Sequence, residues 1–184
     1  MAIGDDGINW DDNWTHIQVI VEDAPVSEFA WCRNLIPEKF TVCELGCGPG
    51  RYANAWKQLG GVYYGIDMSP VAIRRAKEMH PDIADHFIQA NNSEIHLFGT
   101  AFDIVFTNAH LQHIDNTKKA YLFRRVTEHI RLGGLILMKC EKHDVDTKTT
   151  INKDRLVDMI KGFGFELIAY AGDPTNGFVF RRVK

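Results

Sequence analysis

The chain has 184 residues, 45% of them hydrophobic and 24% charged, which is the composition of one globular domain of ordinary size. Its net charge of −3 provides no basic field for a polyphosphate partner. The acidic start lacks the cationic and apolar regions of a signal peptide, no apolar run approaches the length of a membrane span, and the four cysteines follow no framework spacing. We therefore expect a single domain over residues 1–184, located in the cytoplasm and without a membrane partner.

The first 36 residues precede the regular part of the chain. Residues 8–20 are rich in Trp, Asp and His and show no clear period, whereas residues 25–35 are expected to form a helix that ends before Pro37. From residue 40 onward short apolar strands alternate with helices. The strands are expected at 40–45, 62–66, 86–90, 102–107, 135–140, 165–170 and 178–183, and the helices at 52–59, 69–79, 116–131 (closed by a glycine pair) and 152–161.

Alternating strands and helices predict right-handed βαβ units and a parallel sheet. The last two strands are joined only by the turn-like run GDPTNG, which is too short for a parallel crossover. We therefore expect an α/β fold, a three-layer α/β/α sandwich around a seven-stranded, mostly parallel sheet with an antiparallel C-terminal strand. Residues 37–184 would form this core, and residues 1–36 an N-terminal lid or helical segment.

The segment VCELGCGPGRY, residues 42–52, runs from the first strand through a glycine loop into a helix. Ligands of such sheets bind outside the carboxyl ends of the strands, and glycines let the backbone approach them closely. The helix that follows would favour a carboxylate of the ligand at its N-terminus. A dinucleotide fingerprint would need glycine at position 51, where the chain has Arg51, so the spacing disfavours a nicotinamide dehydrogenase.

Acidic residues at two strand ends define the ligand further. Glu44 precedes the glycine loop, and a carboxylate there suits a ligand with an ammonium group better than one with a pyrophosphate. Asp67 ends the second strand, where it can accept hydrogen bonds from both hydroxyls of a ribose, and the soft side chain of Met68 can pack on an adenine face. The pattern indicates a nucleoside with an amino-acid tail.

Four motifs together resemble those of the class I S-adenosylmethionine-dependent methyltransferases, from about residue 40 to the C-terminus: CELGCGPGRY, YYGIDMSPVAIRRAKE, FDIVFTNAHLQHI and LGGLILMK. The resemblance implies a Rossmann-like core and S-adenosylmethionine as cofactor. Asn91 and Asn92 stand where many relatives place an acidic residue near the adenine amine, and Asn108 would lie near the transferable methyl group. The cofactor residues implied are Glu44, Gly46, Cys47, Gly48, Gly50, Arg51, Asp67, Met68, Asn91, Asn92 and Asn108.

Two histidines and two tryptophans are candidates for the acceptor side. His110 and His113 follow the fourth strand, and either could take a proton from a hydroxyl acceptor or serve only as a loop or capping residue. His113 is the better candidate, because its place in HLQHI matches a histidine often present in relatives. Trp10 and Trp14 would belong to a lid over the site or to the core, and His143 is a weaker substrate-binding candidate.

The sequence does not support a metal site. Cys43 and Cys47 could begin the cluster motif of the radical enzymes that use the same cofactor, but its third cysteine is replaced by Gly50. We therefore expect no metal.

Comparison with the motifs of two other classes of methyltransferase narrows the chemical class of the methyl acceptor. Residues 108–111 read Asn-Ala-His-Leu rather than the Asn/Asp-Pro-Pro-aromatic run of enzymes that methylate base amines. Lys139 fits the lysine of one family of ribose 2′-O-methyltransferases, but Asn108 replaces that family's carboxylate. We expect in-line methyl transfer to a small molecule. The alternatives are an RNA or protein acceptor, or a non-catalytic subunit that binds the cofactor; the acceptor atom and the oligomeric state stay open.

Overall fold

The computed structural model describes residues 1–16, 22–139, 147–173 and 175–184. Its strands are β1 (Phe40–Leu45), β2 (Gly61–Asp67), β3 (Phe87–Gln89), β4 (Phe102–Asn108), β5 (Ile130–Lys139), β6 (Phe165–Ala171) and β7 (Gly177–Arg182). The α-helices are α1 (Trp10–His16), α2 (Ala53–Gln58), α3 (Pro70–Met79), α4 (Asn116–His129) and α5 (Lys153–Gly162). Short 3-10 turns are η1 (Val26–Phe29), η2 (Arg33–Leu35), η3 (Pro81–His86), η4 (Asn92–Phe98) and η5 (Leu111–His113).

The seven strands form one sheet in the order β3-β2-β1-β4-β5-β7-β6. Neighbouring strands from β3 to β5 pair in parallel, whereas β7 pairs antiparallel with both β5 and β6. The short turn between β6 and β7 forces this reversal, because it cannot cross the sheet. The expected fold class, a mostly parallel seven-stranded sheet with an antiparallel C-terminal strand, is confirmed.

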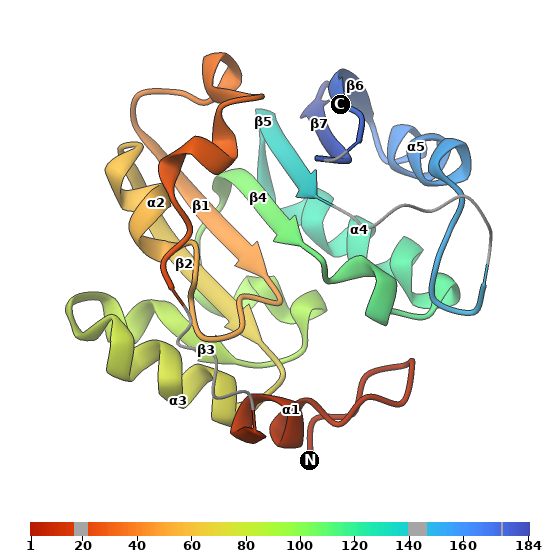
Figure 1. Cartoon of the computed structure of the whole chain (residues 1–184). Coiled ribbons are helices and arrows are strands. Elements are labelled where there is room, and N and C mark those ends of the chain that lie inside the picture. The colour runs from red at the N-terminus through yellow and green to blue at the C-terminus, as the bar shows by residue number, and fades with distance from the viewer. Residues whose placement is uncertain (17–21, 140–146, 174) are drawn as a thin grey trace.

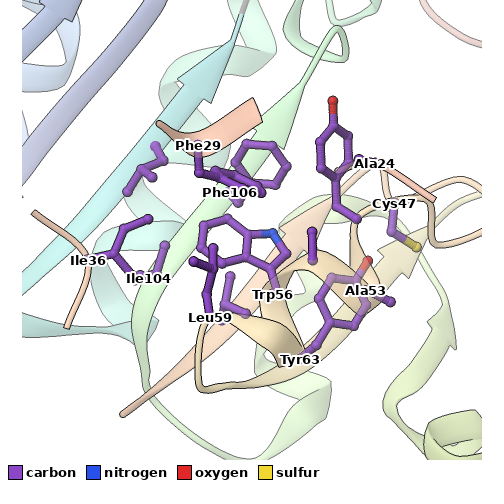
Figure 2. Packing of buried hydrophobic residues seen from close by; sticks show 14 of the residues in the cluster. Ala24, Phe29, Ile36, Cys47, Ala53, Trp56, Leu59, Tyr63, Ile104 and Phe106 are labelled. Carbon is purple, nitrogen blue, oxygen red and sulfur yellow. The ribbon is translucent and has the colours of Figure 1, made fainter. Parts of the chain in front are cut away.

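Both faces of the sheet are covered, which explains the near-continuous apolar runs of its central strands. Alternate residues of β1 join different cores: Val42 packs under α2 and η1, and Cys43 packs under α4 and α5. Trp56 of α2 is fully buried in the first core and lies against Phe29 and Phe106 (Figure 2). These two layers of helices hold the strand ends rigidly where the loops begin.

Residues 1–16, called the N-terminal segment from here on, lie across the end of the sheet to which the arrowheads of β1, β2 and β4 point (Figure 1). Its helix α1 lies within the stretch for which the sequence showed no clear period. Asp11 of α1 accepts a hydrogen bond from Ser69 Oγ at 2.8 Å, beside the start of α3. The helix is thus placed by tertiary contacts rather than by a buried face of its own, since none of its residues is buried.

Two expected elements were wrong. Residues 25–35 form the separate turns η1 and η2 instead of one helix, because Phe29 and Cys32, three residues apart, both face the core, which suits 3-10 geometry. The helix expected to reach residue 131 ends at His129, and β5 already begins at Ile130. Its glycine pair lies inside the strand, where a Cβ at Gly134 would meet the carbonyl of Asp103 at 2.9 Å.

In the described part of the chain, no helix combines the length and the apolarity needed to cross a bilayer.

Candidate cofactor and acceptor site

A cavity of about 1200 Å³ lies at the carboxyl ends of β1, β2 and β4 and extends under the N-terminal segment. Nearly all residues singled out from the sequence line it. These are Glu44, Gly46, Cys47, Gly48, Arg51, Asp67, Met68, Asn91, Asn92, Asn108, His110, His113, Trp10 and Trp14. Gly50 does not line it, and His143 lies outside the described residues. Chain segments far apart in sequence therefore converge on one cavity.

The glycine loop adopts backbone conformations that require glycine. Gly46 has φ +69°, and a Cβ there would lie 2.4 Å from the ring of His110. Gly48 has φ +53°, and a Cβ there would lie 2.9 Å from the ring of Trp14. Gly50 supports the loop from behind, since its Cβ position is 3.0 Å from Phe87. The loop can approach a ligand closely because it has no side chains at these points.

The amides of this loop are already bonded within the protein. The N–H of Gly46 donates to Ile66 O and to Asn92 Oδ1, and the N–H of Gly48 donates to Asp67 Oδ2. Helix α2 has only six residues, and its N-cap residue Tyr52 lines the cavity. The expectation that the N-terminus of this helix favours the ligand's carboxylate stays a prediction. The nearest cation that lines the cavity is Arg51, which pairs with Glu28 at 3.1 Å.

Glu44 is a carboxyl group buried without a cationic partner among the described residues. It is 3% exposed, and the Tyr63 hydroxyl donates to its Oε2 at 2.7 Å. Burial raises the pKa of Glu44 to about 8, with a further contribution from the charge of Asp67, although the hydrogen bond from Tyr63 acts in the opposite direction. Near neutral pH this raised pKa keeps Glu44 largely protonated, and a cationic ligand group would favour its ionised form.

Asp67 closes β2 with both carboxylate oxygens oriented by the backbone. Oδ2 accepts from the Gly48 N–H at 2.9 Å, and Oδ1 accepts from the Ser69 N–H at 2.8 Å. Burial raises the pKa of Asp67, and these backbone bonds oppose the rise. Each oxygen keeps further acceptor capacity, so the carboxylate can still receive hydroxyl donors from a ligand.

Asn91 and Asn92 have different local tasks. The side chain of Asn91 caps η4 by accepting from the Ser93 N–H at 3.1 Å. Asn92 accepts from Gly46 through Oδ1, which leaves its Nδ2 to donate to His110 Nε2 at 2.7 Å. Asn92 thereby joins the glycine loop to the segment that follows β4.

His110 is held as a neutral imidazole. Because Asn92 donates to Nε2, that nitrogen is the acceptor and the ring proton is on Nδ1. Burial lowers the pKa of His110 to about 4, with smaller contributions from His113 and Lys119. The preceding Ala109 has φ +48°, a strained conformation that turns the ring toward Gly46.

His113 pairs with a residue that the sequence did not indicate. Its Nδ1 lies 2.5 Å from Asp6 Oδ2, and its ring packs edge-on against Trp10 with centroids 4.7 Å apart. The neighbouring Asp5 accepts from the Asp115 N–H at 2.9 Å. The only sequence signal for these contacts was the run of acidic residues near the N-terminus, which has no characteristic spacing.

Gln112 also lines the cavity and was missed, although it stands between the two histidines of HLQHI. Its side-chain oxygen is buried and has no hydrogen-bond partner in the described part of the chain. Lys139, by contrast, does not line the cavity. Its ammonium pairs with Glu28 at 2.7 Å, so the ribose-methylating arrangement is not formed here.

The model of the methyltransferase domain family matches residues 42–134, half of the chain. The chain belongs to this family, and its fold is that of the class I S-adenosylmethionine-dependent methyltransferases. The family and the fold expected from the sequence are both confirmed.

Similar proteins fit this assignment. The malonyl-[acyl-carrier protein] O-methyltransferase of Enterobacter lignolyticus is 30% identical over 52% of this chain and 36% of its own. The chain spans between about a third and about a half of the length of such relatives.

Two solved structures share the fold. A TehB-like S-adenosylmethionine-dependent methyltransferase from Corynebacterium glutamicum has a TM-score of 0.71 at 15% identity, with 96% and 97% of the two chains covered. Magnesium protoporphyrin IX methyltransferase from Synechocystis, with S-adenosylmethionine bound, has a TM-score of 0.66 at 15% identity, with 85% and 76% covered. The family and this complex support S-adenosylmethionine as the cofactor, as the sequence predicted.

Proposed function

We propose that the protein transfers a methyl group from S-adenosylmethionine to a small-molecule acceptor by in-line displacement. The observation that carries this proposal is the single cavity of about 1200 Å³ shared by the strand ends and the N-terminal segment. Sites for one small molecule usually measure about 300–1,000 Å³, so this cavity has room for a nucleoside and a second small ligand. The end beyond the glycine loop is lined by Trp10, Gln112 and His113, which would contact the acceptor.

The cofactor end fits S-adenosylmethionine group by group. Glu44 would receive the ammonium group, which supplies the positive charge that this buried carboxyl lacks. Asp67 would accept from the ribose hydroxyls, Met68 would pack on the adenine, and Asn91 or Asn92 would lie at its edge. Arg51 would attract the carboxylate in place of the loop amides, which are already bonded.

When bound, S-adenosylmethionine supplies an electrophilic methyl group on a sulfonium sulfur. The chain's own part is to align the acceptor and to exclude water. We assign this part to the N-terminal segment, which is fastened by Asp11 to Ser69 on one side and by Asp5 to Asp115 on the other. Trp14 of this segment covers Gly48, so it would close over the bound cofactor.

A carrier-linked acyl group is the second candidate acceptor, since the relatives named above act on malonyl-[acyl-carrier protein]. The rim of the cavity carries Lys118 and Tyr121, both strongly exposed, where a carrier could dock. An RNA ribose is disfavoured, because Lys139 is paired with Glu28.

The first test is calorimetric titration with S-adenosylmethionine, S-adenosylhomocysteine and NAD. We expect the first two to bind and NAD not to bind. Asp67→Ala should weaken cofactor binding at least about tenfold, because charge-assisted hydrogen bonds contribute about 1.5–3 kcal/mol. Asp85→Ala, at an exposed position, is the matched control. Unchanged affinity of Asp67→Ala would contradict the role of Asp67, and NAD binding would contradict the cofactor.

The acceptor is tested by methyl transfer from radiolabelled S-adenosylmethionine. A cell extract is separated into a deproteinised small-molecule fraction, a protein fraction and an RNA fraction. We expect label in the small molecules. Label in acidic carrier proteins would favour the carrier-linked acceptor, and label in RNA or in none of the fractions would overturn the proposal of a small-molecule enzyme.

A further inference from the structure

The two histidines after β4 differ in whether a lone pair is free to accept a proton. His110 uses Nε2 to accept from Asn92, and its other ring nitrogen carries the proton. His113 uses Nδ1 toward Asp6, and no hydrogen bond to its Nε2 is formed within residues 1–16, 22–139, 147–173 and 175–184. Both rings line the cavity, but of the two only His113 has a ring nitrogen without a hydrogen bond in the described part of the chain.

Asp6 is held in place independently of the histidine. Its Oδ1 accepts from the N–H of Ile8 at 3.1 Å within the turn at the start of the chain, and this bond points Oδ2 toward His113. A second bond ties the same turn to the histidine, since the N–H of Asp5 donates to the carbonyl of His113 at 3.2 Å. Trp10, edge-on at 4.7 Å, restricts rotation of the imidazole ring.

A carboxylate can only accept a hydrogen bond, so an imidazole nitrogen 2.5 Å from it must carry the proton. The proton on Nδ1 leaves Nε2 as the basic nitrogen. This is the arrangement by which an aspartate orients a catalytic histidine and stabilises the imidazolium that forms.

We propose that Asp6 is a positioning residue that holds His113 with its proton on Nδ1, so that Nε2 takes the proton of a hydroxyl acceptor. The inference rests on the proposed methyltransferase function and names its acceptor class. A hydroxyl group needs such a base, whereas a carboxylate or a neutral amine does not. The N-terminal segment accordingly does more than cover the site, because it supplies the carboxylate that orients the basic histidine.

The proton and electron balance is complete without a further reactant. The acceptor oxygen forms a bond to the methyl carbon while the carbon–sulfur bond breaks. The electron pair of the broken bond stays on sulfur. The hydroxyl proton passes to Nε2 of His113. The resulting imidazolium donates through Nδ1 to the Asp6 carboxylate and returns its extra proton to water after product release.

The tautomer of His113 can be measured without knowing the acceptor. Imidazole ¹⁵N resonances of the full chain, with S-adenosylhomocysteine bound, are assigned by the loss of the His113 signals in His113→Gln. We expect a protonated Nδ1 and an unprotonated Nε2 in the wild type. In Asp6→Asn the amide can donate to Nδ1, so the proton should move to Nε2. Asp12→Asn, an exposed change on the same segment, should keep the wild-type pattern. A proton on Nε2 in the wild type, or no change in Asp6→Asn, would overturn the proposal.

Kinetic measurements on the two variants then distinguish the loss of a catalytic base from a general structural defect. The probes are phenols of graded acidity, from 4-methylphenol, which is protonated at the assay pH, to 4-nitrophenol, which is largely ionised. Positioned bases contribute about 10²–10⁴-fold, so kcat for 4-methylphenol should fall by about that factor in His113→Gln and at least about tenfold in Asp6→Asn. The rate with ionised 4-nitrophenol and the KM for S-adenosylmethionine should change less than about twofold.

Each contrary outcome has its own meaning. Equal losses for both phenols in Asp6→Asn would show a structural role and refute the base. A wild type that binds the cofactor but methylates no phenol would refute the acceptor class inferred here. A wild type that does not bind S-adenosylmethionine at all would instead refute the proposed function.

Discussion

We predict that cofactor binding releases a proton from the buried carboxyl of Glu44. Its pKa is raised from 4.5 to about 8 by burial, so without a bound ligand this group is mostly protonated at pH ~7. An ammonium group bound beside it would favour the carboxylate and expel that proton. Glu44→Gln keeps the shape and the acceptor for the Tyr63 hydroxyl but has no proton to lose.

The same shift makes the stability of the empty protein depend on pH. The native state binds the Glu44 proton more tightly than the unfolded chain, so this group lowers the free energy of unfolding as pH rises from about 4.5 to about 8. At about 1.4 kcal/mol per pH unit, the loss reaches about 4 kcal/mol at pH ~7.5. Glu44→Gln removes this loss, so its stability relative to the wild type should increase by about that amount over the same range.

Two assays check these magnitudes. Urea unfolding at several pH values gives the stability difference, and Glu78→Gln, an exposed change, is the control. Calorimetric titration with S-adenosylhomocysteine in buffers of different ionisation enthalpy gives the number of protons released. We expect the wild type to release clearly more protons at pH ~7 than Glu44→Gln, by up to about one proton for each cofactor bound. Equal release from the two proteins, together with parallel pH profiles of stability, would refute the reasoning.

Two further substitutions probe the framework of the site. Gly46→Ala should lower the free energy of unfolding by about 2–4 kcal/mol, because its positive φ is unfavourable and its Cβ would meet His110 at 2.4 Å, whereas Gly99→Ala, at φ +65° with no atom within 4 Å, should cost only about 1 kcal/mol. Equal losses in urea unfolding would contradict the steric part of this account. Burial lowers the pKa of His110 to about 4, so the unfolded chain binds its proton more tightly and wild-type stability falls as pH drops from about 6.5 to about 4. His110→Phe should remove this loss, and its stability relative to the wild type should rise by about 2 kcal/mol between pH ~7.5 and pH ~5; no such rise would show that the native ring is protonated.

The strands were predictable because each is a short apolar run bounded by turn residues. The antiparallel pairing of β6 and β7 was predictable from the short turn between them, whereas the order of the strands in the sheet was not predicted. The errors arose where tertiary contacts decided the local structure. The sequence around Phe29 is compatible with a helix, but two 3-10 turns place both Phe29 and Cys32 in the core.

That most of the candidate cofactor residues would line one cavity was predictable for a different reason. Glu44, Gly46 and Asp67 occupy strand ends and a loop next to them in sequence, so a linear motif carries their geometry. The bonding of the Gly46 and Gly48 amides was not predictable, since their acceptors come from β2 and η4. Asn92 lies 46 residues from Gly46, and no pattern around either residue indicates that one accepts from the other.

The acceptor side likewise depends on contacts with distant segments, one of them 107 residues away. The motif HLQHI offers both His110 and His113 and favours His113 by position, and the structure distinguishes the two rings through their partners. Asn92, 18 residues away, donates a hydrogen bond to a nitrogen of the His110 ring, and Asp6, 107 residues away, accepts a hydrogen bond from the His113 ring. A motif can therefore place two histidines at the cavity. Which of them could act as a base depends on the distant residues that form hydrogen bonds with each ring. With Asp6 as the residue that orients His113, proton acceptance would depend on the docking of the first residues of the chain as much as on the sheet that carries the cofactor site.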